Sequence, residues 1–195
     1  MNLAENIAAT YLRLNGFFLL PHFTVLKGDR HNHIDLLALR AAGAEEKVPG
    51  SATPKSLPVD DQLFGKLDEL FQIKGKSASS KSNFIGMMAE VRSNRNKDEI
   101  DEPHISYVRP LFGNAHLFRA LFFRAKNFEM KISGKNHDEL EIDIIYASKW
   151  ILKRIEETEK FENLLTKTKS WALSEPFLSD IMQLRDYGLL QAIEA

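Results

Sequence analysis

The sequence predicts an α/β protein with a mixed central sheet flanked by helices and followed by a helical C-terminal tail. Three observations predict it. Apolar residues recur at helical spacing over residues 2–15, apolar segments of strand length follow at 17–26, 33–40 and 84–92, and helical spacing returns after residue 150. A chain of 195 residues fits one domain with a sizeable core, so we expect a single domain over residues 1–195.

The first element is a predicted helix over residues 2–15. Its apolar face carries residues spaced three or four apart, namely Leu3, Ile7, Tyr11 and Leu14. Asn2 followed by Glu5 three residues later fits a capping box at its start. Gly16 stands where a helix commonly ends with a left-handed residue. Residues 17–26 are rich in Phe, Leu and Val, and Pro21 predicts a bend or a sheet edge there.

A turn at residues 28–32 leads into a strand over 33–40 that is apolar on both faces, which is typical of a central, covered strand. Residues 41–58 contain three prolines and are predicted to be a long loop. A short helix is expected over 59–72, then a second loop over 74–83, and a strand over 84–92. The loop and helix of residues 41–83 therefore interrupt the core as an insertion.

The remaining segments complete the expected core at residue 148. Residues 104–125 are predicted to contain a helix over their second half, and residues 128–133 and 140–148 are predicted to be strands joined by a turn. Residues 149–195 are predicted to be a helical extension, in which Ser174 caps a last helix over 175–187. Its apolar residues fit either the core or a homodimer surface.

Composition restricts the classes of partner and site. A net charge of −1 gives no global electrostatic attraction to nucleic acid or membrane, so such a partner requires a local patch. The absence of cysteine excludes disulfides, thiolate metal sites and cysteine nucleophiles, and it fits a reducing cytoplasm. No signal peptide and no run of about 20 apolar residues is present, so we expect a soluble cytoplasmic protein without a membrane partner.

Glu90, Arg92 and Asp35 are the residues most suited to chemistry. Glu90 and Arg92 are two apart on a predicted strand and share a face. A carboxylate at the end of a covered strand is costly unless it is paired or bound to a cation, and Arg92 is one available partner. Asp35 is the only acid in its apolar strand, and if the two strands pair it converges with Glu90 to form a site suited to Mg²⁺ or Mn²⁺. Alternatively, Asp35 is bonded to local backbone at a strand start.

The order of these segments resembles the PD-(D/E)XK nuclease superfamily, in the branch related to Holliday-junction resolvases. The residues that carry the resemblance are Glu5 in the first helix, Leu14-Asn15-Gly16-Phe17 at its end, Asp35 within Ile34–Ala38, and Ala89-Glu90-Val91-Arg92. The resemblance covers residues 1 to about 130. It implies a restriction-endonuclease-like fold with the element order helix, strand, strand, strand, helix, strand.

The resemblance also implies roles for single residues. Asp35 and Glu90 would hold Mg²⁺ or Mn²⁺, with the Val91 carbonyl as a third ligand, and Glu5 would orient or complete the site unless it serves only the capping box. Arg92 stands where the family has lysine, and arginine stays protonated but still stabilises negative charge. The expected activity is metal-dependent hydrolysis of nucleic-acid phosphodiester bonds. The alternative is a catalytically degenerate nuclease fold that binds nucleic acid or a protein.

Three further possibilities concern neighbouring residues. Gln72-Ile73-Lys74 also fits a relaxed form of the family motif, and Lys74 or Lys76 is a possible source of the missing amine. His31, His33 and Asp35 share a strand face if that strand starts early, which fits a transition-metal site. Basic residues on both sides of the third strand are expected to contact the phosphates of DNA, unless they only form solvated loops; they are Lys74, Lys76, Lys81, Arg95 and Lys97.

Overall fold

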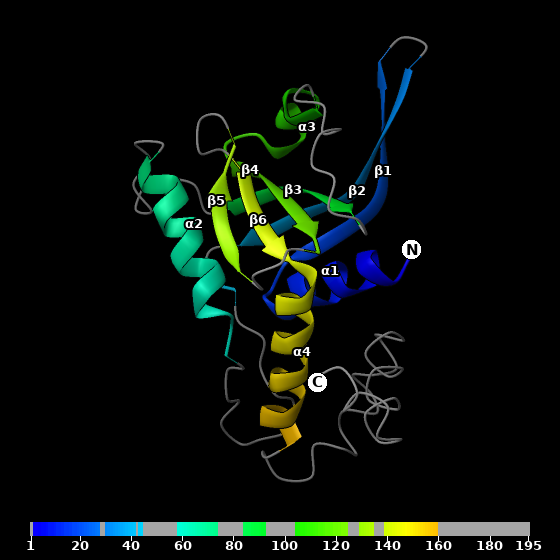
Figure 1. Ribbon diagram of the computed structural model, residues 1–195. Coiled ribbons are helices and arrows are strands. Elements are labelled where there is room, and N and C mark those ends of the chain that lie inside the picture. Colours follow the sequence, from blue (N-terminus) through cyan, green and yellow to red (C-terminus); the bar gives the residue numbers. More distant parts are fainter. Residues whose placement is uncertain are drawn as a thin grey trace, which may run out of the picture.

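The computed structural model describes residues 2–27, 30–41, 43–44, 58–73, 84–92, 104–124, 129–134 and 139–159. The helices are α1 (Leu3–Leu14), α2 (Asp61–Ile73), α3 (His104–Phe112) and α4 (Ile144–Glu159). The strands are β1 (Phe18–Lys27), β2 (Arg30–Ala41), β3 (Phe84–Arg92), β4 (His116–Phe123), β5 (Met130–Ser133) and β6 (Glu139–Asp143). Figure 1 shows their arrangement.

The six strands form one mixed sheet in the order β1-β2-β3-β4-β6-β5. β1 to β3 are joined antiparallel, whereas β3, β4 and β6 run parallel and β5 returns antiparallel beside β6. A parallel pair requires a crossover, and α3 lies in the connection between β3 and β4. The predicted α/β class with a mixed sheet is confirmed.

Helices cover both faces of the sheet, and the strands alternate accordingly (Figure 1). One face packs against α1, α2 and α4, and we call the apolar cluster there the three-helix cluster. The other face packs against α3 in a smaller cluster, the α3 cluster. Met87, Ala89 and Val91 of β3 belong to the three-helix cluster, whereas Met88 belongs to the α3 cluster. Glu90 and Arg92 therefore follow Met88 onto the α3 side of the sheet.

The ends of α1 follow the predicted capping chemistry. Glu5 N donates to the Asn2 side chain at 3.0 Å and the Glu5 carboxylate accepts from Asn2 N at 3.1 Å, which completes the capping box. At the other end Gly16 has φ +81° and donates to Arg13 O, while Phe17 N donates to Leu12 O. This pair of bonds is the Schellman arrangement that a left-handed residue allows.

Asp60, which is buried just before α2, connects this helix to the rest of the fold through hydrogen bonds. Its carboxylate accepts from the Tyr11 hydroxyl at 2.5 Å and from the Tyr146 hydroxyl at 2.8 Å, so α1 and α4 both bond to it. Its backbone N–H donates to Asn15 Oδ1 at 2.7 Å. Burial, followed by the charge of Asp60, raises the pKa of Tyr11 well above its ordinary value. The predicted insertion thus contributes a buried polar network to the core.

Predictions for the first two strands hold except at their turn. β1 lies at the edge of the sheet, where Pro21 costs no ladder hydrogen bond. β2 lies between β1 and β3 and has apolar contacts on both faces, as expected for a covered strand. The turn predicted over residues 28–32 is wrong in part, because β2 begins at Arg30 and pairs there with Lys27.

Two predictions in the second half of the chain are wrong. The helix expected in the second half of residues 104–125 lies instead in the first half, and the second half is β4. β4 is apolar on both faces, so its sequence shows no alternation that would mark a strand. The strand expected over 140–148 ends at Asp143, whose Oδ1 accepts from Ile145 N at 2.7 Å. The helix α4 therefore begins at Ile144, five residues before the predicted helical tail. Ser174 and the helix predicted over 175–187 lie outside the described residues.

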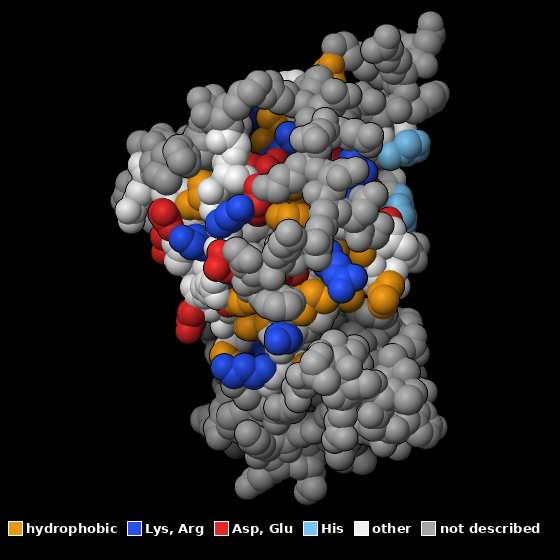
Figure 2. All heavy atoms as spheres, in the orientation of Figure 1, with side chains coloured by type: hydrophobic (Ala, Val, Ile, Leu, Met, Phe, Trp, Pro, Cys, Tyr) orange, Lys and Arg blue, Asp and Glu red, His pale blue; other side chains and the backbone are white. Residues whose placement is uncertain are grey.

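The surface of the described part shows no single-sign field on the face seen in Figure 2. Basic, acidic and hydrophobic side chains are interspersed there, which agrees with the net charge of −1. Within the described ranges, no helix is long and apolar enough to cross a membrane.

Candidate functional site

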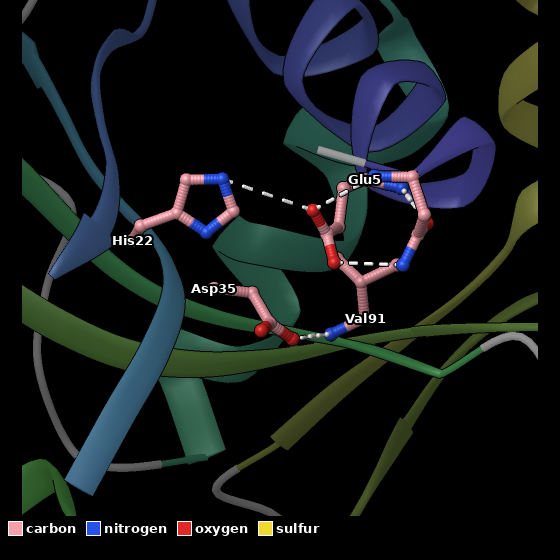
Figure 3. Close-up of polar contacts among 5 residues, drawn as sticks. Glu5, His22, Asp35 and Val91 are labelled. Atoms are coloured by element: carbon pink, nitrogen blue, oxygen red, sulfur yellow. Dashed lines mark hydrogen bonds and ion pairs between the residues drawn. The ribbon is translucent and has the colours of Figure 1, made fainter. Parts of the chain in front are cut away.

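The candidate site lies where β2 and β3 separate. Their ladder ends at the pair Leu36–Ala89, one step before Asp35 and Glu90 would face each other. Asp35 Oδ2 accepts from the Val91 backbone N–H at 2.7 Å, so the carboxylate replaces a carbonyl acceptor in the ladder (Figure 3). The structure thereby brings Asp35 beside the Glu90–Val91 segment, as strand pairing predicts.

Glu90 is the electrostatically unusual member of this pair. It is 4% exposed, and its Oε1 atom is buried without a hydrogen-bond partner among the described residues. Burial, followed by the negative charge of Asp35, raises the pKa of Glu90 to about 7, although Arg92 and Arg119 oppose the rise. A buried carboxyl whose pKa is raised beside a second carboxylate is common at functional sites.

Two guanidinium groups lie near Glu90. Arg92 Nη2 is 3.7 Å from Glu90 Oε2, and the Arg92 side chain is 38% exposed. The sequence did not suggest Arg119. It lies on β4 opposite Met88, diagonal to Glu90, and its Nε is 3.4 Å from Glu139 Oε2. The missing signal was the strand character of β4, without which the alignment of Arg119 with β3 has no basis.

Glu5 approaches from the start of α1, and both oxygens of its carboxylate bond to Asn2 in the capping box. Its Oε2 also lies 4.0 Å from Nε2 of His22 on β1. Figure 3 shows the Glu5 carboxylate directed toward the His22 ring, and the Asp35 carboxylate directed toward the Val91 backbone N–H. Glu5 therefore serves the capping box and also lies beside His22. His22 is a second residue that the sequence did not single out.

The donor set at the site fits a cation with oxygen ligands. Glu90 Oε1 has no partner in the described part of the chain, and Asp35 has a second oxygen beyond the one bonded to Val91. In a strand the N–H and C=O of one residue point to the same side, so the Val91 carbonyl also faces β2. Among the described residues, however, no three His, Asp or Glu side chains are placed together as a metal-binding group.

The structure describes only some of the remaining predicted residues. Gln72 lies on α2, so the competing motif Gln72-Ile73-Lys74 begins on a helix and not on a strand. β2 does start early enough for His31, His33 and Asp35 to lie on one strand, but the His31 side chain lies outside the described residues. The basic residues expected to contact DNA also lie outside them; they are Lys74, Lys76, Lys81, Arg95 and Lys97.

Comparison with known proteins adds no relative to this description. No protein-family model, no curated protein and no solved structure matches the chain. Any functional assignment therefore rests on the geometry of the site and on the resemblance carried by its residues.

Proposed function

We propose that this protein is a metal-dependent nuclease that hydrolyses nucleic-acid phosphodiester bonds, with DNA as the first substrate to test. The observation that carries the proposal is the meeting of Asp35 with the Glu90–Val91 segment at the separation of β2 and β3. The raised pKa of Glu90, about 7, supports it, because a divalent cation would offset both the burial of the Glu90 charge and its repulsion from Asp35.

The order of elements is a second support. α1, β1, β2, β3, α3 and β4 follow the order helix, strand, strand, strand, helix, strand that the resemblance implies, with α2 inserted between β2 and β3. Glu5, Asp35 and Glu90 then fall on the first helix, the second strand and the third strand, where the family pattern has its acids.

Each residue has a distinct task in the proposed reaction. Asp35 is held in place by the Val91 N–H. Asp35, Glu90 and the Val91 carbonyl would hold Mg²⁺. The bound ion supplies activation of water and neutralisation of charge on the phosphate. Arg92 cannot accept a proton, but its half-exposed guanidinium can donate to the phosphate oxygens while it remains beside Glu90.

The test is cleavage of plasmid, branched and single-stranded DNA in Mg²⁺ or Mn²⁺. We expect wild-type cleavage, and loss of it in Asp35→Asn and Glu90→Gln, because each change removes a charged ligand while keeping the shape of the side chain. Asp68→Asn, on the exposed face of α2, is the matched control and should cleave like wild type. Equal cleavage by all four proteins would exclude the assigned site.

Binding of the ion has a readout that does not depend on cleavage. If Mg²⁺ binds only the folded protein, it should raise the thermal midpoint in a concentration-dependent manner. The rise should disappear in Glu90→Gln and persist in Asp68→Asn. A midpoint that Mg²⁺ leaves unchanged in the wild-type protein contradicts the proposed metal site, whatever the cleavage assay shows.

A second candidate function is nucleic-acid or protein binding without cleavage. The ion pair between Glu90 and Arg92 favours it, since it supplies a protein partner for the buried carboxylate. This reading predicts DNA binding without cleavage and no heat on titration with Mg²⁺. Arg92→Lys separates the two readings: a gain of cleavage would show that the site is built for hydrolysis but lacks its amine.

A further inference from the structure

His22 interrupts β1 at the position that faces Asp35. The ladder between β1 and β2 contains the pairs Pro21–Leu36 and Phe23–Ile34, but not the pair between them. His22 has φ +52°, and within the described residues it is the only non-glycine residue with a positive φ. Such a conformation is uncommon for a side chain with a Cβ, and residues held in it often lie at functional sites.

At His22 on β1 and Asp35 on β2, the alternation of side chains between the two faces of the sheet is interrupted. Leu19 packs with the three-helix cluster, whereas Phe23, four residues later, packs with the α3 cluster. On β2, Leu36 belongs to the three-helix cluster, whereas Ile34, two residues earlier, belongs to the α3 cluster. Residues an even number apart on a regular strand share a face, so each strand contains a local reversal. Because β1 and β2 reverse at facing positions, the register between them is the same on both sides. The reversal changes the direction of the His22 and Asp35 side chains, as a β-bulge does.

The redirected ring of His22 lies beside Glu5 and is open to solvent. Its Nε2 lies 4.0 Å from Glu5 Oε2, and the His22 side chain is 55% exposed. In Figure 3 the ring points toward the Glu5 carboxylate, and Asp35 lies on the neighbouring strand β2. Its other nitrogen, Nδ1, makes no hydrogen bond to any residue that the structure describes. Glu90, by contrast, has a side chain that is only 5% exposed, so His22 is the more accessible of the two to an incoming polymer.

We propose that His22 contacts the phosphate backbone of nucleic acid bound at Asp35 and Glu90, an inference that rests on the proposed function. Two carboxylates repel a phosphate, so a site built on them needs donors at its rim. Arg92 supplies one donor, and His22 supplies another from the opposite side of Asp35. An imidazole has two ring nitrogens, so Nε2 can remain beside Glu5 while Nδ1 donates to the anion. His22 is thus a substrate-positioning residue contributed by β1.

The test compares His22→Gly with His22→Asn. Glycine adopts a positive φ without strain, so it removes the ring and preserves the backbone. Asparagine also tolerates this conformation, and its amide nitrogen occupies the place of Nδ1. Binding of a fluorescent DNA oligonucleotide is measured by anisotropy between 50 and about 200 mM salt, a range over which phosphate contacts dominate. Thermal melts monitor folding.

We expect the thermal midpoint of His22→Gly to equal or exceed that of wild type. Its affinity for DNA should be roughly tenfold lower, and its slope of log affinity against log salt should be smaller by roughly one phosphate contact. His22→Asn should recover part of the affinity and part of the salt slope. A purely structural role would not change the slope of log affinity against log salt. In the cleavage assay, His22→Gly should raise KM more than it lowers kcat.

The outcomes separate this inference from the function on which it rests. If His22→Gly binds DNA with the affinity and salt slope of wild type, while Asp35→Asn still abolishes cleavage, the role of His22 is wrong and the nuclease assignment stands. If the wild-type protein binds no DNA, both are wrong. Loss of affinity in His22→Gly without a change in salt slope also refutes a phosphate contact.

Discussion

Replacing Glu90 with glutamine should stabilise the protein at pH 8 and leave its stability near pH 4.5 almost unchanged. Glutamine keeps the shape of the side chain but carries no charge, so it does not have to be ionised in a buried position beside Asp35. The raised pKa of Glu90 means that the folded state holds this proton more tightly than the unfolded chain does.

The magnitude follows from the rise of the Glu90 pKa from 4.5 to about 7. At about 1.4 kcal/mol for each tenfold change in proton affinity, the rise corresponds to roughly 3 kcal/mol. Below pH 4.5 Glu90 is protonated in both states, and no penalty exists. As the pH rises from 4.5 to 7, the unfolded chain ionises first, so the free energy of unfolding falls by roughly 3 kcal/mol and then stays level. The free energy of unfolding of Glu90→Gln does not show this fall between pH 4.5 and 7.

The assay is urea denaturation of wild type and Glu90→Gln at several pH values between 4.5 and 8, without divalent cations. The difference in free energy of unfolding should grow with pH and level off above pH 7. Asp35→Asn should show a smaller part of the same gain, because burial, and not Asp35, is the larger cause of the raised pKa. A difference between wild type and Glu90→Gln that does not vary with pH would refute the reasoning.

Three further predictions concern the fold. Tyr146→Phe removes a hydroxyl donor from Asp60 and should lower the free energy of unfolding by about 1–2 kcal/mol in urea; no loss would mean that water replaces the bond. Gly86→Ala would place a Cβ 2.5 Å from the Phe112 ring and should cost about 1–3 kcal/mol, whereas the double variant with Phe112→Leu should recover stability; strictly additive losses in thermal melts contradict this contact. Asn2→Ala removes the capping box and should cost about 1 kcal/mol, seen as a lower thermal midpoint; an unchanged midpoint would show that α1 does not depend on its cap.

The sequence was sufficient for elements with strong local signals. Asn2, Glu5 and Gly16 define both ends of α1, and Pro21 indicates a bend or a sheet edge, because capping and proline effects act within a few residues. β4 was missed because burial on both faces removes the alternation that identifies a strand. The start of α4 was missed for a related reason: Asp143 caps the helix from within an apolar run that continues into it.

From the sequence, the arrangement of the site could be predicted only where it follows from the pairing of β2 with β3. The approach of Asp35 to Glu90 follows if their strands are neighbours. The bond from Val91 N–H to Asp35, the place of Arg119 and the reversal at His22 depend on register and on where two strands separate. These are long-range features, set by the packing of segments that are distant in the chain, and no local pattern contains them.

The network at Asp60 has a consequence for shortening this chain. Residues 41–83 would be the natural segment to remove, since β2 and β3 are already neighbours and a short turn could join them. Such a deletion would take away the acceptor of the fully buried Tyr11 hydroxyl and leave it unsatisfied, at a cost of about 1–3 kcal/mol. It would also expose core that α2 covers. The smallest autonomous version of this domain therefore includes α2, and a minimal redesign without it needs Tyr11→Phe together with new apolar cover.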